Sequence, residues 1–304
     1  MATLQERLER GEVIILDGAT GTELEKRGAP MDGAAWSAAA LITHPDTVRE
    51  VHEDYIRAGA DIIITNSFST ARHVLEPAGL GARLHELNLR SVRLAQEARH
   101  NVADRPILIA GSISTFNAHL DHAYQPSVEQ AQANYREQAE LLAQAGVDLI
   151  MLEMMRDIEQ AAAAVQAAVA TGLPVWVGFS CKLDHNGTVM LWDEEHTLAT
   201  ALELIPALGA SGVSVMHTLT EDIASALPVV LEHWSGPVGV YAHSGKFIMP
   251  NWQFVDMISP EAYATEAQNW VQLGAQLIGG CCGIGPEHIR LLKERLPSHL
   301  PPTD

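Results

Sequence analysis

The feature that most constrains the fold is a series of eight short apolar runs separated by stretches with helical periodicity. The runs are continuous rather than alternating, which is typical of strands covered on both faces in a parallel sheet. Several runs directly follow a glycine that closes a helical stretch, as in IRAG-ADIIITN and LAQAG-VDLIMLE. The eight runs are residues 13–17, 61–66, 107–112, 148–153, 175–180, 212–217, 238–243 and 277–282.

Eight such strands alternating with helices in a chain of 304 residues predict an α/β fold, a (β/α)8 TIM barrel. A doubly wound open sheet is the alternative, because the number of strands does not by itself show that the sheet closes. We find no linker or low-complexity stretch that divides the chain, so we expect a single domain over residues 1–304. The longest insertion-like loop is expected at residues 243–258, after the seventh strand.

The helical stretches begin and end at residues that suit these positions. Four glycines are placed where a helix ends and positive φ is needed, namely Gly59, Gly146, Gly172 and Gly274. Ser127 with Gln130 is typical of a capping box, Asp157 of an N-cap, and Ser259 of an N-cap followed by proline at the first helical turn. These residues predict where seven of the helix ends lie.

The composition favours a globular protein that binds small molecules. Hydrophobic residues make up 47% of the chain and charged residues 19%, which supports a sizeable core. The formal charge of −19 argues against nucleic acid or an anionic membrane surface as a partner. No window of about 18 apolar residues and no apolar signal segment is present, so we expect a cytoplasmic protein. Three cysteines fit a reduced compartment, and a homo-oligomer is compatible with the sequence.

The residues that end the apolar runs indicate where the chemistry takes place. In a barrel, the side chains at the carboxyl ends of the strands gather at one face, where the active site forms. Nearly all of these residues are polar or of a metal-ligand type: Asp17, Asn66, Ser112, Glu153, Ser180, Cys181, His217, His243, Cys281 and Cys282. We therefore expect a polar site at this face, with metal-ligand side chains in it.

The adjacent pair Cys281 and Cys282 indicates a zinc site. Two thiolates and a third ligand from another strand would leave one open coordination position. His217, at the end of the run GVSVMH, is the natural third ligand, and Cys181 is the competing one. The alternative is that the cysteines are small buried residues at a close helix contact.

Two carboxylates, Asp17 and Glu153, follow apolar runs and face the same predicted site. They could hold a substrate ammonium group or act as general acid and base. The alternative is that each caps the following helix or pairs with an arginine such as Arg156. Gly18 and Gly21 would let backbone amides approach a ligand carboxylate.

Three aromatic residues are candidates for a wall that faces a cation. Only 5% of the chain is aromatic, so Trp36, Phe68 and Tyr241 beside the predicted site are noteworthy. The alternative for each is core packing.

These motifs together resemble the homocysteine S-methyltransferase family, zinc-dependent barrels that include betaine- and S-methylmethionine-dependent enzymes. The resemblance covers almost the whole chain, through ILDGATGTELEKRG, AAWSAAAL, AGADIIITNSF, LIAGSI, GVDLIMLEMM, PVGVYAHSGK and GAQLIGGCCGIGPEHI. The last motif is the most specific. The resemblance implies a (β/α)8 barrel, a zinc pair at Cys281 and Cys282, and homocysteine-ammonium carboxylates at Asp17 and Glu153.

The sequence departs from the family pattern at two positions that face the predicted site. The family carries a third cysteine where this chain has His217, and many members carry asparagine where this chain has His243. Three thiolates on Zn²⁺ leave a net charge of −1, whereas one histidine and two thiolates leave zero. A bound substrate thiol should therefore lose its proton more easily but be a weaker nucleophile as a thiolate.

The sequence thus predicts a zinc-dependent S-methyltransferase that moves a methyl group from a sulfonium, such as S-methylmethionine, or from betaine to the thiol of homocysteine, giving methionine. The partners are small molecules, an amino-acid thiol and a methyl donor. Zinc is assigned to His217, Cys281 and Cys282. Substrate binding is assigned to Asp17, Gly18, Trp36, Asn66, Glu153, Tyr241 and His243.

Two alternatives remain at this stage. The first is a zinc-dependent hydrolase, or a methyltransferase for a different small thiol or amino acid, because histidine replaces the third cysteine. The second is a binding protein without activity. Methyltetrahydrofolate is disfavoured as donor, because the barrel uses the whole chain and leaves no folate or corrinoid module.

Overall fold

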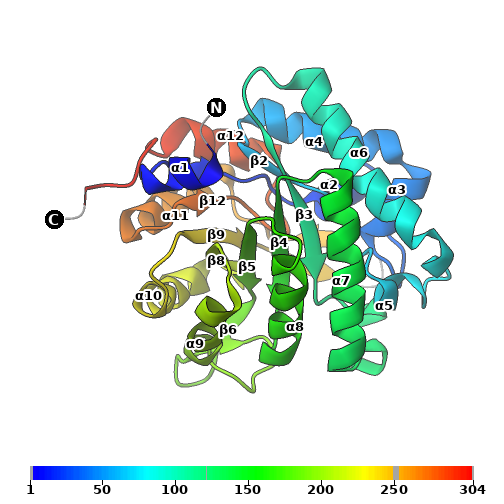
Figure 1. Cartoon of the computed structure of the whole chain (residues 1–304). Helices are drawn as coiled ribbons and strands as arrows, with labels where there is room; N and C mark the ends of the chain where they lie inside the picture. Colours follow the sequence, from blue (N-terminus) through cyan, green and yellow to red (C-terminus); the bar gives the residue numbers. More distant parts are fainter. Residues whose placement is uncertain (1–2, 121, 249–252, 303–304) are drawn as a thin grey trace.

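Eight parallel strands form the central sheet of the computed structural model, which describes residues 3–120, 122–248 and 253–302 (Figure 1). The strands are β1 (Ile14–Ile15), β2 (Ile62–Ile64), β3 (Leu108–Ser114), β4 (Leu149–Met155), β5 (Val175–Phe179), β8 (Gly212–Leu219), β9 (Val238–His243) and β12 (Leu277–Ile278). Each strand falls within or overlaps one of the eight predicted runs, so the prediction of the strands is confirmed.

The sheet closes on itself into a barrel. Its strand order is β1-β12-β9-β8-β5-β4-β3-β2, with every neighbouring pair parallel. The two ends of this order meet at a parallel bridge between Leu16 and Ile62, where the amide of Asp17 donates to the Ile62 carbonyl over 3.0 Å. The predicted TIM barrel is therefore confirmed, and the open sheet is excluded.

Helices surround the strands on the outside of the barrel (Figure 1). They are α1 (Leu4–Glu9), α2 (Thr20–Lys26), α3 (Ala40–Thr43), α4 (Pro45–Ala58), α5 (Arg72–Leu75), α6 (Leu84–Val102), α7 (Val128–Ala145), α8 (Ile158–Val169), α9 (Leu198–Leu208), α10 (Ile223–His233), α11 (Pro260–Leu273) and α12 (Pro286–Arg295). Within the described ranges, no helix has the length and apolar character needed to cross a bilayer.

The predicted helix ends are confirmed except at Gly172, which lies two residues beyond Ala170, the C-cap residue of α8. Ser127 and Gln130 form a capping box at α7, and the side chains of Asp157 and Ser259 accept hydrogen bonds from the first turns of α8 and α11. The four glycines expected at helix ends all have positive φ, between 79° and 114°: Gly59, Gly146, Gly172 and Gly274. Local side-chain chemistry therefore determines where these helices begin and end.

The apolar runs are buried on both sides, as their continuous pattern predicts. All seven residues of β4 and all six of β9 are buried. Outside β4 and β5, α8 buries a face of small side chains that includes Ala161, Ala164 and Ala168. Small residues let this helix lie close to the strands and hold their carboxyl ends in place.

Two short antiparallel hairpins extend from the barrel, and neither was predicted from the sequence. The first is β6 (Cys181–Leu183) with β7 (Val189–Leu191), directly after β5. The second is β10 (Lys246–Ile248) with β11 (Gln253–Val255), within the expected loop at 243–258. Part of that loop, residues 249–252, lies outside the described residues.

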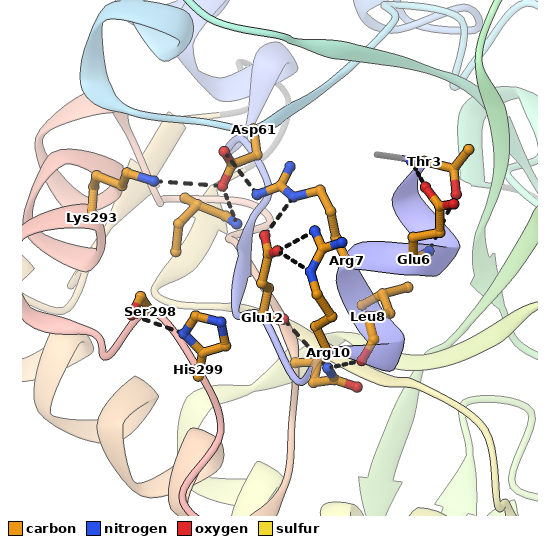
Figure 2. A network of polar contacts seen from close by, with 12 residues as sticks. Thr3, Glu6, Arg7, Leu8, Arg10, Glu12, Asp61, Lys293, Ser298 and His299 are labelled. Carbon is orange, nitrogen blue, oxygen red and sulfur yellow. Dashed lines mark hydrogen bonds and ion pairs between the residues drawn. The ribbon is translucent and has the colours of Figure 1, made fainter. Parts of the chain in front are cut away.

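A polar network ties the chain termini to the amino ends of the strands (Figure 2). Asp61, just before β2, accepts a hydrogen bond from the Ile15 amide over 3.0 Å. Its carboxylate also lies 3.5 Å from the Arg7 guanidinium and 3.7 Å from Lys293 Nζ. Arg7 in turn pairs with Glu12 at 2.8 Å. This network stabilises the face of the barrel opposite to the carboxyl ends of the strands.

Candidate active site

A cavity of about 870 Å³ opens at the carboxyl ends of the barrel strands. Of the predicted metal and substrate residues, seven line it: Gly18, Trp36, Asn66, Glu153, His217, Cys281 and Cys282. Three do not line it, namely Asp17, Tyr241 and His243, which are buried around it. The structure thus brings the predicted residues to one end of the barrel, but at two different depths.

The side chains of His217, Cys281 and Cys282 form a cluster on the wall of this cavity. His217 Nδ1 lies 3.7 Å from Cys281 Sγ, and the two sulfur atoms lie 3.9 Å apart. One ligand atom from each residue lies within 4.8 Å of the others. In a tetrahedral zinc site, bond lengths of about 2.0–2.3 Å place ligand atoms about 3.5–3.8 Å apart. The donor types and spacing of this cluster therefore fit a zinc ion.

Without a bound cation, the surroundings of Cys281 favour its neutral thiol. The hydrogen bond that Cys281 Sγ donates to Cys282 Sγ, together with burial, raises the pKa of Cys281 well above its ordinary value. Both thiols are free of disulfide bonds. Because metal binding requires thiolates, a cation at the cluster would supply the charge that this buried environment lacks.

The backbone around the cluster adopts strained conformations. His217 has φ 44°, at a bulge between β8 and β9 that follows Met216. Met154, which also lines the cavity, has φ 55° at a bulge between β4 and β5. Such conformations cost about 1–3 kcal/mol each in a non-glycine residue and cluster at functional sites. We infer that the bulge in β8 serves to turn the His217 ring toward the cysteines.

The turn that carries the cysteines requires glycine for steric reasons. Gly283 has φ 82°, and a Cβ there would lie 2.5 Å from the Ser244 carbonyl oxygen. At Gly280, a Cβ would lie 2.2 Å from the Ile284 side chain. Gly280 and Gly283 thus flank the two cysteines because the backbone at both positions lies too close to neighbouring atoms for a larger residue. This close packing fixes the positions of both sulfur atoms.

His243 lies behind His217. The two ring centroids are 4.7 Å apart, and the ring of Trp192 lies 5.9 Å from His217 on another side. Burial, and to a smaller extent His217, lowers the pKa of His243 to about 3. Among the described residues, His243 Nδ1 has no hydrogen-bond partner. His243 is therefore neutral and supports the ring of His217 rather than facing the cavity.

The two predicted carboxylates differ in depth. Glu153 faces the cavity, and its carboxylate accepts a short hydrogen bond from the Ser112 hydroxyl. Burial raises the pKa of Glu153 to about 7. Asp17 is fully buried below it, where the Ile64 amide donates to Oδ2 over 2.8 Å. Burial, and less strongly the charge of Glu153, raises the pKa of Asp17 well above its ordinary value.

Two polar atoms close to these carboxylates lack partners among the described residues. They are Asp17 Oδ1 and the Tyr241 hydroxyl, both buried. Burial raises the pKa of Tyr241, with further contributions from Glu153, Cys281 and Asp17. The alternative that Glu153 pairs with Arg156 is not realised, since no ion pair joins them in the described part of the chain. Unused hydrogen-bonding capacity in a buried site suits a polar ligand.

The aromatic wall differs from the prediction in one member. Trp36 and Phe68 line the cavity with ring centroids 5.6 Å apart, as expected. The third ring is Phe116, 5.7 Å from Phe68. Tyr241 is not part of this wall, because its ring on β9 packs inside the barrel with 1% of its surface exposed. Phe116 was not predicted from the sequence, because it follows β3 in a segment without a distinctive motif.

The amide of Asn66 is committed to the loop that carries Trp36. Asn66 Oδ1 accepts a hydrogen bond from the Ser37 hydroxyl over 2.8 Å, and Nδ2 donates to the Ser37 carbonyl over 3.0 Å. Trp36 itself has φ 42°. Asn66 therefore holds the indole side of the cavity in position.

Cys181 does not belong to the metal cluster. It begins β6, its side chain is buried, and it neither lines the cavity nor lies with His217 and the cysteine pair. Burial raises the pKa of its thiol strongly. Of the two candidates for the third ligand, only His217 is close to Cys281 and Cys282.

The rim of the cavity is acidic, and its residues were not predicted from the sequence to be part of the site. Beside Glu153, five carboxylate residues line the cavity: Asp157, Glu159, Asp193, Glu194 and Glu195. The run at 193–195 is visible in the sequence. Its position over the cavity depends on the hairpin of β6 and β7, which was not predicted.

The barrel, its cavity and the imidazole–thiol cluster define a TIM-barrel enzyme with a candidate metal centre. The model of the homocysteine S-methyltransferase family matches residues 14–296, and the chain belongs to this family.

The names of similar proteins agree with this family assignment. The chain is similar to homocysteine S-methyltransferase from Escherichia coli, with 32% identity over 96% of this chain and 98% of that protein. It is also similar to selenocysteine methyltransferase from Astragalus bisulcatus, with 28% identity over 97% and 96% of the two chains. Among solved structures, it resembles the metallated form of homocysteine methyltransferase MmuM from E. coli, with a TM-score of 0.79, 29% identity, and coverage of 95% and 98%.

Proposed function

We propose that this protein transfers a methyl group from a sulfonium donor of the S-methylmethionine type, or from betaine, to the thiol of homocysteine, giving methionine. The observation that carries the proposal is the cluster of His217, Cys281 and Cys282 on the wall of the cavity, with ligand atoms within 4.8 Å of one another. These three residues would hold one zinc ion. When bound, zinc would lower the pKa of the acceptor thiol, so that a thiolate is available at neutral pH.

The carboxylates of the site suit an amino-acid acceptor. Glu153 faces the cavity, and Asp17 lies below it with one oxygen unpartnered in the described part of the chain. An ammonium group placed against them would lower the raised pKa of both acids and use their free hydrogen-bonding capacity. Gly18 brings the backbone to the cavity, since a Cβ there would lie 2.3 Å from the Ile284 carbonyl oxygen.

The aromatic wall suits the cationic methyl donor. Trp36, Phe68 and Phe116 present apolar ring surface to the cavity, which attracts an onium group and excludes water. In the transfer, the acceptor sulfur forms a bond to the methyl carbon while the bond from that carbon to the donor sulfur or nitrogen breaks. The electron pair returns to the donor atom, which leaves as a neutral thioether or amine, and the thiol proton is released to water.

A second acceptor follows from the relatives. One relative is named a selenocysteine methyltransferase, and this chain carries a neutral set of one imidazole and two thiolates instead of three thiolates. A neutral set holds a substrate thiolate more tightly, which favours an acceptor that remains strongly nucleophilic when bound. A selenol is such an acceptor.

The three free cysteines further suit a reducing compartment such as the cytoplasm.

The experiment combines metal content with labelled transfer. We expect about one zinc per chain in freshly reduced protein, much less in His217→Ala, and retention in His217→Cys, which restores a ligand of the family type. We also expect a ¹³C-methyl group to move from S-methylmethionine or betaine to homocysteine in the wild type and not in Cys282→Ser.

Two results would contradict the proposal. Full zinc content in His217→Ala would show that the third ligand is another residue. Incorporation of ¹⁸O from water into the product, without methyl transfer, would show that the site is a hydrolase.

A further inference from the structure

One basic side chain stands out in the acidic cavity. Arg156 is the only lysine or arginine among the described residues that line it, whereas six lining residues carry carboxylates. A ligand with net negative charge would be repelled by these carboxylates, and a purely cationic ligand would have no use for a guanidinium. The combination suits a ligand that carries both charges.

The guanidinium of Arg156 is held firmly but is not neutralised. Nη2 donates to the Thr115 carbonyl over 2.6 Å and to Asn117 Oδ1 over 3.3 Å, while Nε donates to the Thr115 hydroxyl over 3.2 Å. Among the described residues, no carboxylate oxygen lies within 4.0 Å of its nitrogens and no hydrogen bond uses Nη1. Burial lowers the pKa of Arg156 more strongly than Asp157, Tyr135 and Asp193 raise it. A partly buried cation without an ion pair is open to an anionic group of a ligand.

The position of Arg156 places it across the barrel from the two cysteines of the metal cluster. It directly follows β4, whereas Cys281 and Cys282 follow β12, and these strands are four steps apart in a ring of eight. Arg156 also comes three residues after Glu153, which corresponds to a rise of up to about 10 Å along a strand. Arg156 therefore lies nearer the mouth of the cavity than Glu153. A ligand that reaches from this rim toward the cysteines would cross the aromatic wall.

We propose that Arg156 binds the carboxylate of the methyl donor and thereby selects onium donors that carry a carboxylate. Sulfonium amino acids and betaine both carry a carboxylate besides the onium methyl group. The two hydrogens of Nη1 have no hydrogen-bond partner in the described part of the chain and can donate to a carboxylate, and the pre-ordering of the guanidinium by Thr115 and Asn117 reduces the entropy lost on binding. This inference rests on the proposed function, because it assigns the deeper carboxylates to the acceptor and the outer arginine to the donor.

The test compares two donors that differ only in the carboxylate, using zinc-loaded enzyme. The first donor is S-methylmethionine and the second is its decarboxylated analogue, 3-aminopropyl dimethylsulfonium. We expect Arg156→Gln to lose about 10- to 100-fold in kcat/KM for the first donor, with little loss for the second. Arg156→Lys should retain part of the preference, and KM for homocysteine should not change.

Arg105→Gln is the matched control for a purely structural loss. Arg105 also donates to two backbone carbonyls, of Ile56 at 2.7 Å and Ala60 at 2.9 Å, but it does not line the cavity. This variant should leave the ratio of the two donors unchanged. Equilibrium dialysis of each labelled donor with enzyme lacking acceptor gives the same comparison as a binding constant, independent of turnover.

The outcomes separate this inference from the proposed function. An equal loss for both donors in Arg156→Gln, or a rise in KM for homocysteine instead, overturns the role of Arg156 while leaving methyl transfer intact. If the wild type transfers no methyl group at all, the proposed function fails. In that case, the dialysis decides separately whether Arg156 binds a carboxylate. If the wild type prefers the donor that carries a carboxylate and Arg156→Gln loses this preference, the role of Arg156 is retained. If the wild type shows no such preference, the role of Arg156 is overturned.

Discussion

Replacing Glu153 by glutamine should stabilise the protein at alkaline pH, because this site retains a carboxylate in an environment that disfavours its charge. Glu153 has 7% of its surface exposed, and burial raises its pKa from an ordinary value of 4.5 to about 7. Glutamine has nearly the same shape and still accepts the hydrogen bond from Ser112. The substitution therefore removes the charge with little effect on packing.

The sign and size of the effect follow from proton linkage. Between pH 4.5 and 7 the folded protein binds more protons at Glu153 than the unfolded chain does, so stability falls as pH rises through this window. The destabilisation is complete above pH 7 and absent below pH 4.5. A difference of about 2.5 pKa units corresponds to about 3 kcal/mol at pH 8 and to about 1 kcal/mol at pH 5.

The assay is urea unfolding of metal-free, reduced protein at pH 5 and pH 8, followed by tryptophan fluorescence. Metal is removed because a bound cation at the neighbouring cluster would itself favour the charged carboxylate. We expect Glu153→Gln to exceed the wild type by about 3 kcal/mol at pH 8, with most of this gain lost at pH 5. The control is Glu159→Gln, an exposed residue of the same cavity rim, which should show no such dependence. A gain that is the same at both pH values, or a loss at pH 8, would refute the reasoning.

Three further predictions concern the metal centre, the aromatic wall and a helix end. Cys181→Ser should keep the metal content of the wild type, whereas Cys282→Ser should lower it, as measured by elemental analysis per chain; loss in both would mean that Cys181 matters to the centre. In Gly21→Ala, the new methyl group would lie 2.4 Å from the Trp36 ring. We therefore expect the free energy of unfolding to fall by about 1–3 kcal/mol and the KM for the methyl donor to rise. If both values are unchanged, the Trp36 ring moves aside without cost and the prediction is wrong. Ser259→Ala removes the cap of α11 and should cost about 1 kcal/mol in urea unfolding without affecting metal content; an intact free energy of unfolding would contradict this.

Much of the fold could be predicted because its signals are local. A strand buried on both faces needs a continuous apolar run, and a helix end needs a residue such as Gly146 or Ser127 whose own chemistry satisfies it. The two hairpins were missed because β6 (CKL) and β10 (KFI) contain a lysine and do not lie in a continuous apolar run. Three residues of mixed character carry no periodicity that separates them from a loop.

The candidate site could be predicted in part for a related reason. The carboxyl ends of the strands converge in any barrel. Because His217, Cys281 and Glu153 end apolar runs, the sequence alone predicted that they lie close together. Sequence position could not show which way a side chain turns. Tyr241 ends up inside the barrel, and Phe116 takes the place expected for it on the wall.

By itself, the sequence determined the eight strands, the barrel, the main helix ends and the types of side chain gathered at one face, because each depends on the chemistry of a few neighbouring residues. Only the tertiary structure decided that the His217 ring turns toward the cysteines at a bulge, that Asp17 lies deeper than Glu153, and that Arg156 has no ion pair within the described chain. These properties depend on distances between residues far apart in the chain. Burial and unpaired charge arise only when such residues are packed together.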